Sequence, residues 1–486
     1  MDFFAPVLNV LARIMVGYAA MFLVPYAWAR ALDPVEMQGI WLESMVLTLL
    51  LGLALWALTQ RQRRELQPRD GFLLVNLVWS VLPALSAVPL MLAIPGLSWT
   101  DAYFEAVSGF TTTGFTILSG LDTLPVSVNV WRCLLQFVGG LGIILLVVAV
   151  LPLLGLGSVQ LYKAEAAGPI KDDRLTPRIA ETARGLWSVY FVFSAACFLA
   201  YRWAGMSWAD AFMHMCSTMG LGGLSSHDAS FAFFNSPLIE GVAVVFMTLS
   251  GVSFARYFVV WRTRSFRALV RDTEVRAYLV ALVGSVLALT VILWQGQTYD
   301  SLLHTLRAVA FHVVSFATTT GYSSQDYSQW PVFAPLWMLA LGSFATCAGS
   351  TGGGMKMVRM ILLFKQAKRE LVLAIHPRVV NPVVLGRTVI GPQVMASVVA
   401  FMLIFLATHI GLTMLLLISG MDLVSAMSAV VGAVNNIGLA LGSVGPTGSF
   451  ASLTDFQTWV CTVAMLLGRL ELLAVMVLFL PRFWRK

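Results

Sequence analysis

Residues 101–117, which read DAYFEAVSGFTTTGFTI, contain the feature that decides the fold of this chain. The segment is moderately apolar but too short to cross a bilayer, which takes about 20 residues of helix, and it runs into the string Thr-Thr-Thr-Gly. Similar segments follow at 210–227 (DAFMHMCSTMGLGGLSSH), 307–325 (RAVAFHVVSFATTTGYSSQ) and 422–443 (DLVSAMSAVVGAVNNIGLALGS). Each runs into a glycine-rich or threonine-rich stretch, so one structural unit is repeated four times.

The four segments align on one glycine, found at Gly114, Gly223, Gly321 and Gly438. Six residues before this glycine stand Ser108, Ser217, Ser315 and Gly432, and nine residues before it stand Glu105, His214, His312 and Ala429. An apolar run of bilayer length precedes and follows each segment. The sequence therefore predicts a unit of helix, short re-entrant segment and helix, repeated four times behind two N-terminal helices.

The rest of the chain has the composition of a polytopic membrane protein. Of its 486 residues, 58% are hydrophobic and 11% are charged, whereas an average soluble domain is roughly 25% charged. This composition excludes a soluble enzyme, a disordered chain and a secreted disulfide scaffold. The five cysteines are scattered singly, nearly all in apolar runs, so we expect them to be free and to behave as small hydrophobic residues.

Apolar runs of spanning length predict ten transmembrane helices. They lie at about 14–29, 41–59, 72–94, 133–155, 186–204, 237–261, 277–294, 333–363, 393–419 and 456–481. Lys and Arg gather in alternate connections, at 61–69, 163–184, 262–276, 365–387 and 482–486, and the positive-inside rule then puts both termini in the cytoplasm. Ala27-Trp28-Ala29 has the form of a signal-peptidase site, but Asp2 and Arg13 favour a retained first helix.

Glycine-rich strings at membrane depth are physically restricted. Hydrocarbon supplies no hydrogen bonds, so irregular backbone is tolerated there only where it is buried in protein or lines water. Four such strings can converge on a common axis, where their carbonyl oxygens replace the hydration shell of a cation. Glycine reaches the backbone angles that such a filter needs, and a helix C-terminus aimed at the axis adds partial negative charge. We therefore expect a pseudo-fourfold ion pore rather than four surface turns.

The strings SGFTTTGFT, STMGLGGLSSHDAS, SFATTTGYSSQDY and NNIGLALGSVG, together with AGSTGGGMK and LLGRLEL, resemble the TrkH/KtrB/HKT superfamily of potassium uptake proteins. The resemblance spans essentially the whole chain, and the two leading helices are similar to those of its TrkH family. It implies a single-chain pore in the bacterial inner membrane. It also implies a homodimer and a cytosolic ring of nucleotide-binding regulatory subunits of the TrkA type.

Carried over to this chain, the resemblance assigns an ion filter to the triplet before each aligned glycine and to the glycine itself. The residues that would bind the transported K⁺ are Thr111, Thr112, Thr113, Gly114, Gly220, Leu221, Gly222, Gly223, Thr318, Thr319, Thr320, Gly321, Asn435, Asn436, Ile437 and Gly438. In related plant transporters a serine at the first glycine goes with sodium permeation, so glycine at all four positions favours potassium. No organic cofactor is expected in this chain.

The glycine-rich string at 348–354 marks a candidate gate. Its four glycines should break the helix expected over 333–363, at about 1 kcal/mol each relative to alanine. The resemblance places this string beneath the filter as a gate, and the alternative is a packing kink against a neighbouring helix. The gate residues would be Gly349, Ser350, Thr351, Gly352, Gly353 and Gly354.

Arg469 lies near the middle of the last expected span, where a charge normally faces a bundle interior or water. The resemblance places it in the permeation path below the filter, as an electrostatic barrier that belongs to the gate. The alternative is a buried salt bridge, either to Glu471 of the partner subunit or to Glu105.

Glu105, His214 and His312 share one position on the re-entrant segments and leave two interpretations open. Ionisable groups at membrane depth can form a proton relay, or they can provide polar support behind the filter. The loops at 163–184, 262–276 and 365–391 are the expected surface for a cytosolic partner, with lipid headgroups as the alternative contact.

The sequence as a whole predicts an all-α membrane protein with ten transmembrane helices. Two N-terminal helices are expected at 1–70 and pore repeats at 71–160, 161–265, 266–370 and 371–486, the third repeat with a broken second helix. We expect passive K⁺ permeation driven by the membrane potential and gated by the cytosolic ring. The alternative is a symporter that couples K⁺ to H⁺ or Na⁺. A membrane enzyme is disfavoured because the chain has no H-E-x-x-H or G-x-S-x-G motif.

Overall fold

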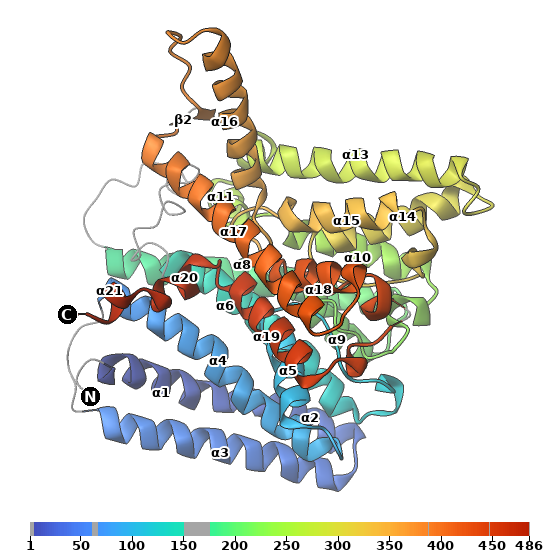
Figure 1. The fold of residues 1–486 in the computed structure, drawn as a ribbon. Helices are drawn as coiled ribbons and strands as arrows, with labels where there is room; N and C mark the ends of the chain where they lie inside the picture. The colour runs from blue at the N-terminus through green and yellow to red at the C-terminus, as the bar shows by residue number, and fades with distance from the viewer. Residues whose placement is uncertain (1–3, 61–66, 150–174, 387, 447, 486) are drawn as a thin grey trace.

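A computed structural model describes residues 4–60, 67–149, 175–386, 388–446 and 448–485 of the chain (Figure 1). These residues are mostly helical, with one small hairpin of β1 (Val384–Leu385) and β2 (Thr388–Val389). The fold is that of an all-α membrane protein, as the sequence predicts. The basic residues at 61–64 and the part of the expected partner loop at 163–174 lie outside the described residues.

Two hydrophobic helices at the N-terminus pack against each other on one side of the molecule (Figure 1). The first consists of α1 (Ala5–Ala19), the 3-10 turn η1 (Ala20–Phe22) and α2 (Leu23–Leu32), and the second is α3 (Val35–Thr59). Asp33, in the turn between them, accepts hydrogen bonds from the backbone NH groups of Val126 and Ser127 at 2.8 and 2.9 Å. These bonds attach the N-terminal pair to the pore-forming part of the chain.

A unit of outer helix, short pore helix and inner helix then occurs four times. The outer helices are α4 (Pro68–Ala93), α8 (Leu175–Trp203), α13 (Thr273–Gln295) and α17 (Pro392–Ile418). The pore helices are α5 (Trp99–Phe110), α9 (Trp208–Gly220), α14 (Leu302–Ala317) and α18 (Leu423–Val434). The inner helices begin with α6 (Val126–Ala149), α10 (Pro237–Ser250), α15 (Phe333–Phe344) and α19 (Asp455–Arg469).

Three of the inner helices are interrupted within the apolar run that the sequence predicts as one span. α10 and α11 (Phe254–Thr263) meet at an angle of 84°, and α19 bends by 105° into α20 (Leu473–Met476) and η8 (Val477–Phe479). α15 is separated from α16 (Met357–Ile375) by the glycine-rich string, where the sequence predicts a break. The other two breaks are not predicted, because a bend leaves the hydropathy of a run unchanged.

Short elements connect these helices. They are α12 (Arg267–Val270), α21 (Pro481–Trp484) and the 3-10 turns η2 (Leu121–Thr123), η4 (Ser230–Phe233), η5 (Tyr327–Gln329), η6 (Gly442–Val444) and η7 (Phe450–Ser452). The ring of Phe4 lies 6.1 Å from that of Trp484, so the two ends of the described chain share one face of the bundle. An even number of crossings requires this arrangement, which agrees with ten spans.

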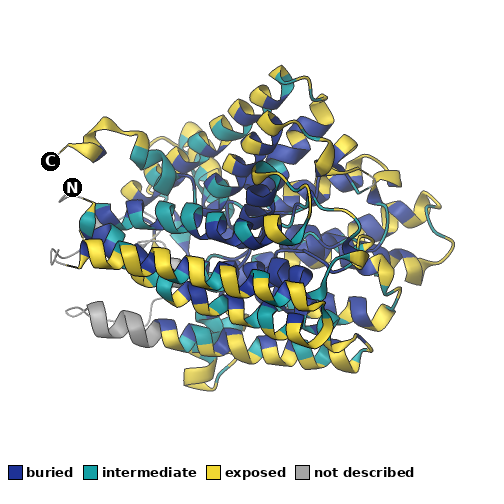
Figure 2. Cartoon of the chain, turned by 90° about the horizontal axis from the view of Figure 1, so that it is seen from below, coloured by how far each residue is buried: buried dark blue, intermediate teal, exposed yellow. Residues whose placement is uncertain are grey.

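The outside of the bundle is apolar and the centre is tightly buried. Within the described ranges, seven helices are long and apolar enough to cross a membrane uninterrupted, and the two bent pairs raise the number to nine. The remaining expected run is the one divided between α15 and α16. Large apolar side chains stay exposed, as at Leu58, Val280 and Leu403. Exposed residues cover the outer sides of the helices, and buried residues gather in the centre (Figure 2). An apolar surface of this extent fits hydrocarbon surroundings.

Candidate functional site

The four pore helices are 12 to 16 residues long and end at the glycine-rich strings. Side chains at the start of three of them, Ser98, Ser207 and Asp422, accept a hydrogen bond from the backbone NH three residues later. Such caps satisfy NH groups at the outer end of a helix. The opposite, C-terminal end carries partial negative charge and leads in each repeat into the string, which we call the axial segment: residues 111–114, 220–223, 318–321 and 435–438.

The axial segments share one backbone conformation although their sequences differ. The middle residue of each triplet is left-handed, with φ of 54° at Thr112, 54° at Leu221, 60° at Thr319 and 51° at Asn436. The glycine also has positive φ, at 90° for Gly114, 77° for Gly223, 91° for Gly321 and 75° for Gly438. Such angles cost a residue with a side chain about 1–3 kcal/mol unless its surroundings enforce them. Their recurrence in all four repeats supports the alignment on the glycine.

The first two axial segments each pack against the segment of the next repeat. A Cβ atom built on Gly114 would lie 1.9 Å from the carbonyl oxygen of Gly222. A Cβ atom on Gly223 would lie 2.0 Å from the carbonyl oxygen of Thr320. In both places the glycine of one repeat touches the residue just before the glycine of the following repeat.

The same contact continues around the axis and closes on itself. A Cβ atom on Gly321 would lie 2.4 Å from the carbonyl oxygen of Ile437. A Cβ atom on Gly438 would lie 2.3 Å from the carbonyl oxygen of Thr113, which belongs to the first repeat. The axial segments therefore form a closed ring of four, and a side chain at any of the four glycines would collide with a backbone carbonyl.

Each axial segment is held from behind by its own pore helix. The residue six before the glycine accepts a hydrogen bond, at 2.8 to 2.9 Å, from the backbone NH just before the glycine: these residues are Ser108, Ser217, Ser315 and Gly432. In the first three repeats the serine hydroxyl also donates, at 2.6 to 2.7 Å, to the carbonyl just after the glycine: these residues are Phe115, Leu224 and Tyr322.

The fourth repeat has Gly432 in place of this serine, and the packing requires it. A Cβ atom on Gly432 would lie 2.6 Å from the carbonyl oxygen of Leu439 and 2.6 Å from the ring of Phe115. The chain after the glycine therefore lies directly on the pore helix. This chain is fixed at Leu441, whose NH and carbonyl form hydrogen bonds of 2.9 and 3.2 Å with the hydroxyl of Ser428, one helical turn before Gly432.

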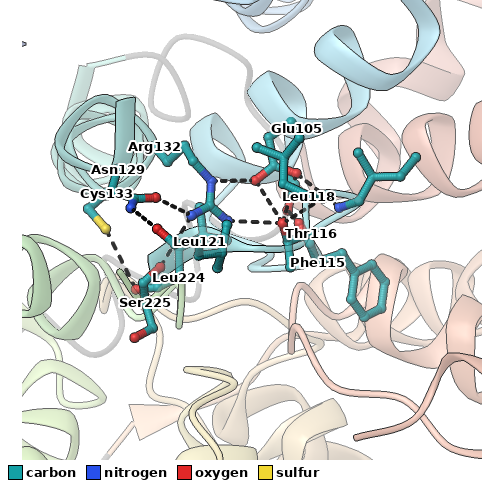
Figure 3. Close-up of polar contacts among 12 residues, drawn as sticks. Glu105, Phe115, Thr116, Leu118, Leu121, Asn129, Arg132, Cys133, Leu224 and Ser225 are labelled. Carbon is teal, nitrogen blue, oxygen red and sulfur yellow. Dashed lines mark hydrogen bonds and ion pairs between the residues drawn. The ribbon is translucent and has the colours of Figure 1, made fainter. Parts of the chain in front are cut away.

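Glu105 lies behind the first axial segment and is held by several polar groups (Figure 3). Its carboxylate forms an ion pair with Arg132 at 2.7 Å and accepts hydrogen bonds from the Thr116 hydroxyl and the Ile117 NH. Arg132 on α6 also donates to the carbonyl of Ser225, which follows the second axial segment. Both charged side chains are buried, and breaking such a pair typically costs about 3–5 kcal/mol. The pair thus connects the first two repeats.

His214 and His312 take the equivalent place in the second and third repeats. Nδ1 of each donates to the carbonyl four residues earlier, at 2.8 and 2.9 Å. Nε2 of His214 lies 3.0 Å from the Ser225 hydroxyl, and Nε2 of His312 lies 3.2 Å from the carbonyl oxygen of Gln325. Each residue joins its pore helix to the chain leaving the axial segment. These contacts favour polar support over a proton relay.

The glycine-rich string lies in a loop between α15 and α16, residues 345–356, which we call the glycine loop. Thr351 donates through its hydroxyl to the carbonyl of Met219 at 3.0 Å, and the NH of Gly353 donates to the Thr319 hydroxyl at 2.8 Å. A Cβ atom on Gly353 would lie 2.1 Å from the carbonyl oxygen of Asn435. The glycine loop therefore packs against the beginnings of three axial segments.

Arg469 is the last residue of α19 and reaches the same region. The sequence places it in the middle of a continuous span, but it lies where that span bends. Its guanidinium donates from Nη1 to the carbonyl of Thr351 at 2.9 Å and from Nη2 to that of Gly139 at 3.2 Å. The residue is 3% exposed, and Nε has no hydrogen-bond partner among the described residues.

The alternative of a salt bridge at Arg469 is not supported within this chain. The carboxylate of Glu471 pairs with Arg359 at 2.6 Å, and Glu105 pairs with Arg132. Arg469 therefore places a buried positive charge beside the glycine loop, held by backbone carbonyls.

Gln136 on α6 is a part of the site that sequence reasoning misses. Its Oε1 accepts a hydrogen bond from the Leu224 NH at 3.1 Å and lies 2.7 Å from the Ser217 hydroxyl. An inner helix of the first repeat thus supports the axial segment of the second. A polar residue inside an apolar run is a usable signal, but the sequence does not reveal its partner.

A group of ionisable side chains joins the outer loops of the first two repeats. Nδ1 of His227 is hydrogen-bonded to Asp122, Nε2 lies 3.2 Å from Asp210, and the ring stacks on Phe233 at a centroid distance of 3.5 Å. Burial lowers the pKa of His227, but the two carboxylates outweigh burial and raise that pKa above its usual value. The hydrogen bond with His227 lowers the pKa of Asp122.

We expect this outer contact to weaken at alkaline pH. A histidine with a raised pKa contributes stability that is complete below its unfolded pKa of about 6.5 and is lost as pH rises through the folded value. Between about pH 6 and about pH 9, the melting temperature of the wild type in detergent should fall more than that of His227→Gln. The exposed His376 supplies a control variant, His376→Gln, which should follow the wild type. Parallel pH profiles for wild type and His227→Gln would contradict the assignment.

Comparisons with known proteins identify the family. The family model of TrkH, described as "Cation transport protein", matches residues 37–486. The chain is 41% identical over 445 residues to "Trk system potassium uptake protein TrkH" of Salmonella typhimurium, covering 91% of this chain and 92% of the relative. It is 42% identical over 457 residues to the protein of that name from Halomonas elongata, covering 92% and 93%.

A solved structure agrees with this assignment over the whole chain. The crystal structure of the potassium transporter TrkH from Vibrio parahaemolyticus is similar with a TM-score of 0.92 at 35% identity, covering 99% of this chain and 100% of that one. The described fold, with its re-entrant pore helices, is thus the TrkH fold. The chain belongs to the TrkH family of cation transport proteins and is a multi-pass membrane transporter, not an enzyme.

Proposed function

We propose that this chain is a potassium-selective uptake protein in which K⁺ permeates passively through the ring of axial segments. The observation that carries the proposal is the closure of the ring, in which each glycine packs against a carbonyl of the next repeat. Carbonyl groups brought together in this way can replace the water around a cation. The names of the relatives, which are potassium uptake proteins, support K⁺ as the ion.

The proposed ligands are backbone carbonyl oxygens of the sixteen axial residues. The axial segments contain only Thr, Gly, Leu, Asn and Ile, so no carboxylate contributes to the attraction. Attraction would come from the carbonyl dipoles and from the C-terminal ends of the four pore helices. A weak, distributed attraction of this kind suits an ion that must enter and also leave.

We propose that the string at 349–354 and Arg469 form the gate. Both are buried against the inner beginnings of the axial segments, so an ion leaving the ring would have to displace the glycine loop. The guanidinium of Arg469 adds a positive charge, and repulsion of a cation is strong where the effective dielectric constant is low. A cytosolic nucleotide-binding ring of the TrkA type would act on this loop.

The surroundings follow from the same proposal. We infer a location in the bacterial inner membrane with both termini cytoplasmic, because the two ends share one face and basic residues gather in alternate connections. The functional unit would be a homodimer. Within each chain, residues 1–70 would form the N-terminal helices and 71–160, 161–265, 266–370 and 371–486 the four pore repeats.

A symporter that couples K⁺ to H⁺ or Na⁺ is supported less well. Coupling to protons would use ionisable groups near the axis, and Glu105, His214 and His312 are the residues expected for it. Their contacts instead hold the chain that leaves each axial segment. The observed geometry therefore favours a pore.

The proposal is tested by ion flux through the purified chain in proteoliposomes. Under an imposed potential and without a proton gradient, uptake of K⁺ and Rb⁺ should exceed that of Na⁺ and Li⁺. Gly114→Ser should lower the preference for K⁺ over Na⁺ by about tenfold, equivalent to about 1.4 kcal/mol, because its Cβ would meet the carbonyl oxygen of Gly222. The control is Gly120→Ser. Gly120 also has a positive φ, but a Cβ atom built on it would lie no closer than 3.4 Å to another group.

Two results would contradict the proposal. Equal loss of selectivity in Gly114→Ser and Gly120→Ser would show that the effect comes from backbone strain and not from the ring. Uptake of K⁺ that requires a proton gradient would favour the symporter.

Removing the charge of Arg469 should increase the leak of K⁺. Arg469→Ala removes both the charge and the hydrogen bonds to Thr351 and Gly139, whereas Arg469→Gln removes the charge but keeps a hydrogen-bond donor. We expect leak conductance in planar bilayers to rise by about tenfold in both variants if charge is the barrier. Unchanged conductance and gating in Arg469→Ala would exclude the role of Arg469 in the gate.

A further inference from the structure

Glu274, in the first turn of α13, contacts both the glycine loop and the first turn of α16, which follows the loop. Its Oε1 atom accepts a hydrogen bond from the NH of Ala348 at 2.8 Å and another from the NH of Val358 at 3.1 Å. The residue is 4% exposed. A buried carboxylate is costly unless donors satisfy it, and here two backbone NH groups at either end of the glycine-rich string do so. One oxygen atom thus connects the two sides of the loop that the proposed function assigns to the gate.

The position of Glu274 is in turn fixed by Asp272, which also contacts α11 of the second repeat. Asp272 caps α13 by accepting hydrogen bonds from the NH groups of Glu274 and Val275, each at 2.9 Å. The other carboxylate oxygen of Asp272 pairs with Arg256 on α11 at 2.8 Å. Displacement of α11 relative to α13 therefore pulls on the residue that holds the glycine loop.

The same end of α11 also contacts the glycine loop directly. The NH of Phe254 donates to the carbonyl of Gly349 at 3.1 Å, and the NH of Cys347 donates to the carbonyl of Gly251 at 3.0 Å. The segment 254–272, which contains α11 and α12, is thus attached to the loop near both of its ends. Its arginines at 262, 264, 267 and 271 are exposed, so a charged partner can reach this segment directly.

We propose that Glu274 is the positioning residue of the gate: it holds the glycine loop in its closed form and transmits to it any movement of the segment 254–272. This inference rests on the proposed function of the loop as a gate. Glu274 acts on the loop through the backbone NH groups of Ala348 and Val358.

The test compares variants of the full purified chain by two independent readouts. The first readout is basal Rb⁺ flux in proteoliposomes. The second is labelling of Cys347, a fully buried residue of the glycine loop, by a maleimide in detergent, measured by mass spectrometry of its peptide. The other four cysteines are also buried and serve as internal controls for general unfolding.

Glu274→Leu keeps the volume and removes both hydrogen bonds, so Cys347 labelling and Rb⁺ flux should each rise about tenfold. Glu274→Gln retains an acceptor oxygen and should stay near the wild type. Glu274→Asp keeps the charge but withdraws it by one methylene, and should loosen the loop even if the leucine variant does not assemble. The matched control is Glu240→Leu, which removes another buried glutamate and its ion pair with Arg307 at 2.8 Å, and should change neither readout.

The outcomes separate this inference from the proposed function. A rise in Cys347 labelling together with flux, restored by Glu274→Gln, supports both. A rise in labelling with unchanged flux would overturn the gate assignment, and with it the role of Glu274 in gating. Unchanged labelling in folded Glu274→Leu or Glu274→Asp would overturn the inference directly, as would an equal rise in Glu240→Leu.

Discussion

Hydrocarbon offers no hydrogen bonds, and the irregular backbone at the centre of this protein is enclosed by other parts of the protein. Four strings with left-handed residues lie at membrane depth, each enclosed by a pore helix and by the string of the next repeat. Because the contact from glycine to carbonyl runs through all four repeats and returns to the first, no string has an open edge. The pore helices, the supporting serines and the buried Glu105–Arg132 pair all follow from the need to hold this ring.

The glycine loop meets the same constraint through hydrogen bonds with groups of the second, third and fourth repeats. Its carbonyl at Thr351 accepts from Arg469 in the fourth repeat, and its flanking NH groups donate to Glu274 at the start of the third. Its threonine hydroxyl donates to the second repeat at Met219. In the proposed gate, the loop is released from these groups when the pore opens. Movement of the helices that carry the groups would then control the loop.

The repeated glycine predicts the ring well. Each of the four segments has a glycine that can adopt a positive φ, and three of them have a serine six residues before it. The string at 348–354 predicts its own break for the same reason. Other features depend on partners far away in the sequence. Gln136 and Glu274 are polar residues whose hydrogen-bond donors lie 88 and 74 residues away in the sequence, and the bends after Ser250 and Arg469 leave hydropathy unchanged. The reason for Gly432 is also hidden, since it lies in the closeness of the Leu439 carbonyl.

We propose that the four axial segments bind a dehydrated K⁺ on their common axis. The most direct test is a crystal structure of the protein soaked in Rb⁺ or Tl⁺, with anomalous scattering recorded for the heavy ion. We expect anomalous peaks on the axis, surrounded by carbonyl oxygens from all four repeats and displaced by excess K⁺ but not by Na⁺. Peaks held by side chains away from the ring, or an axis without peaks at saturating ion, would contradict it.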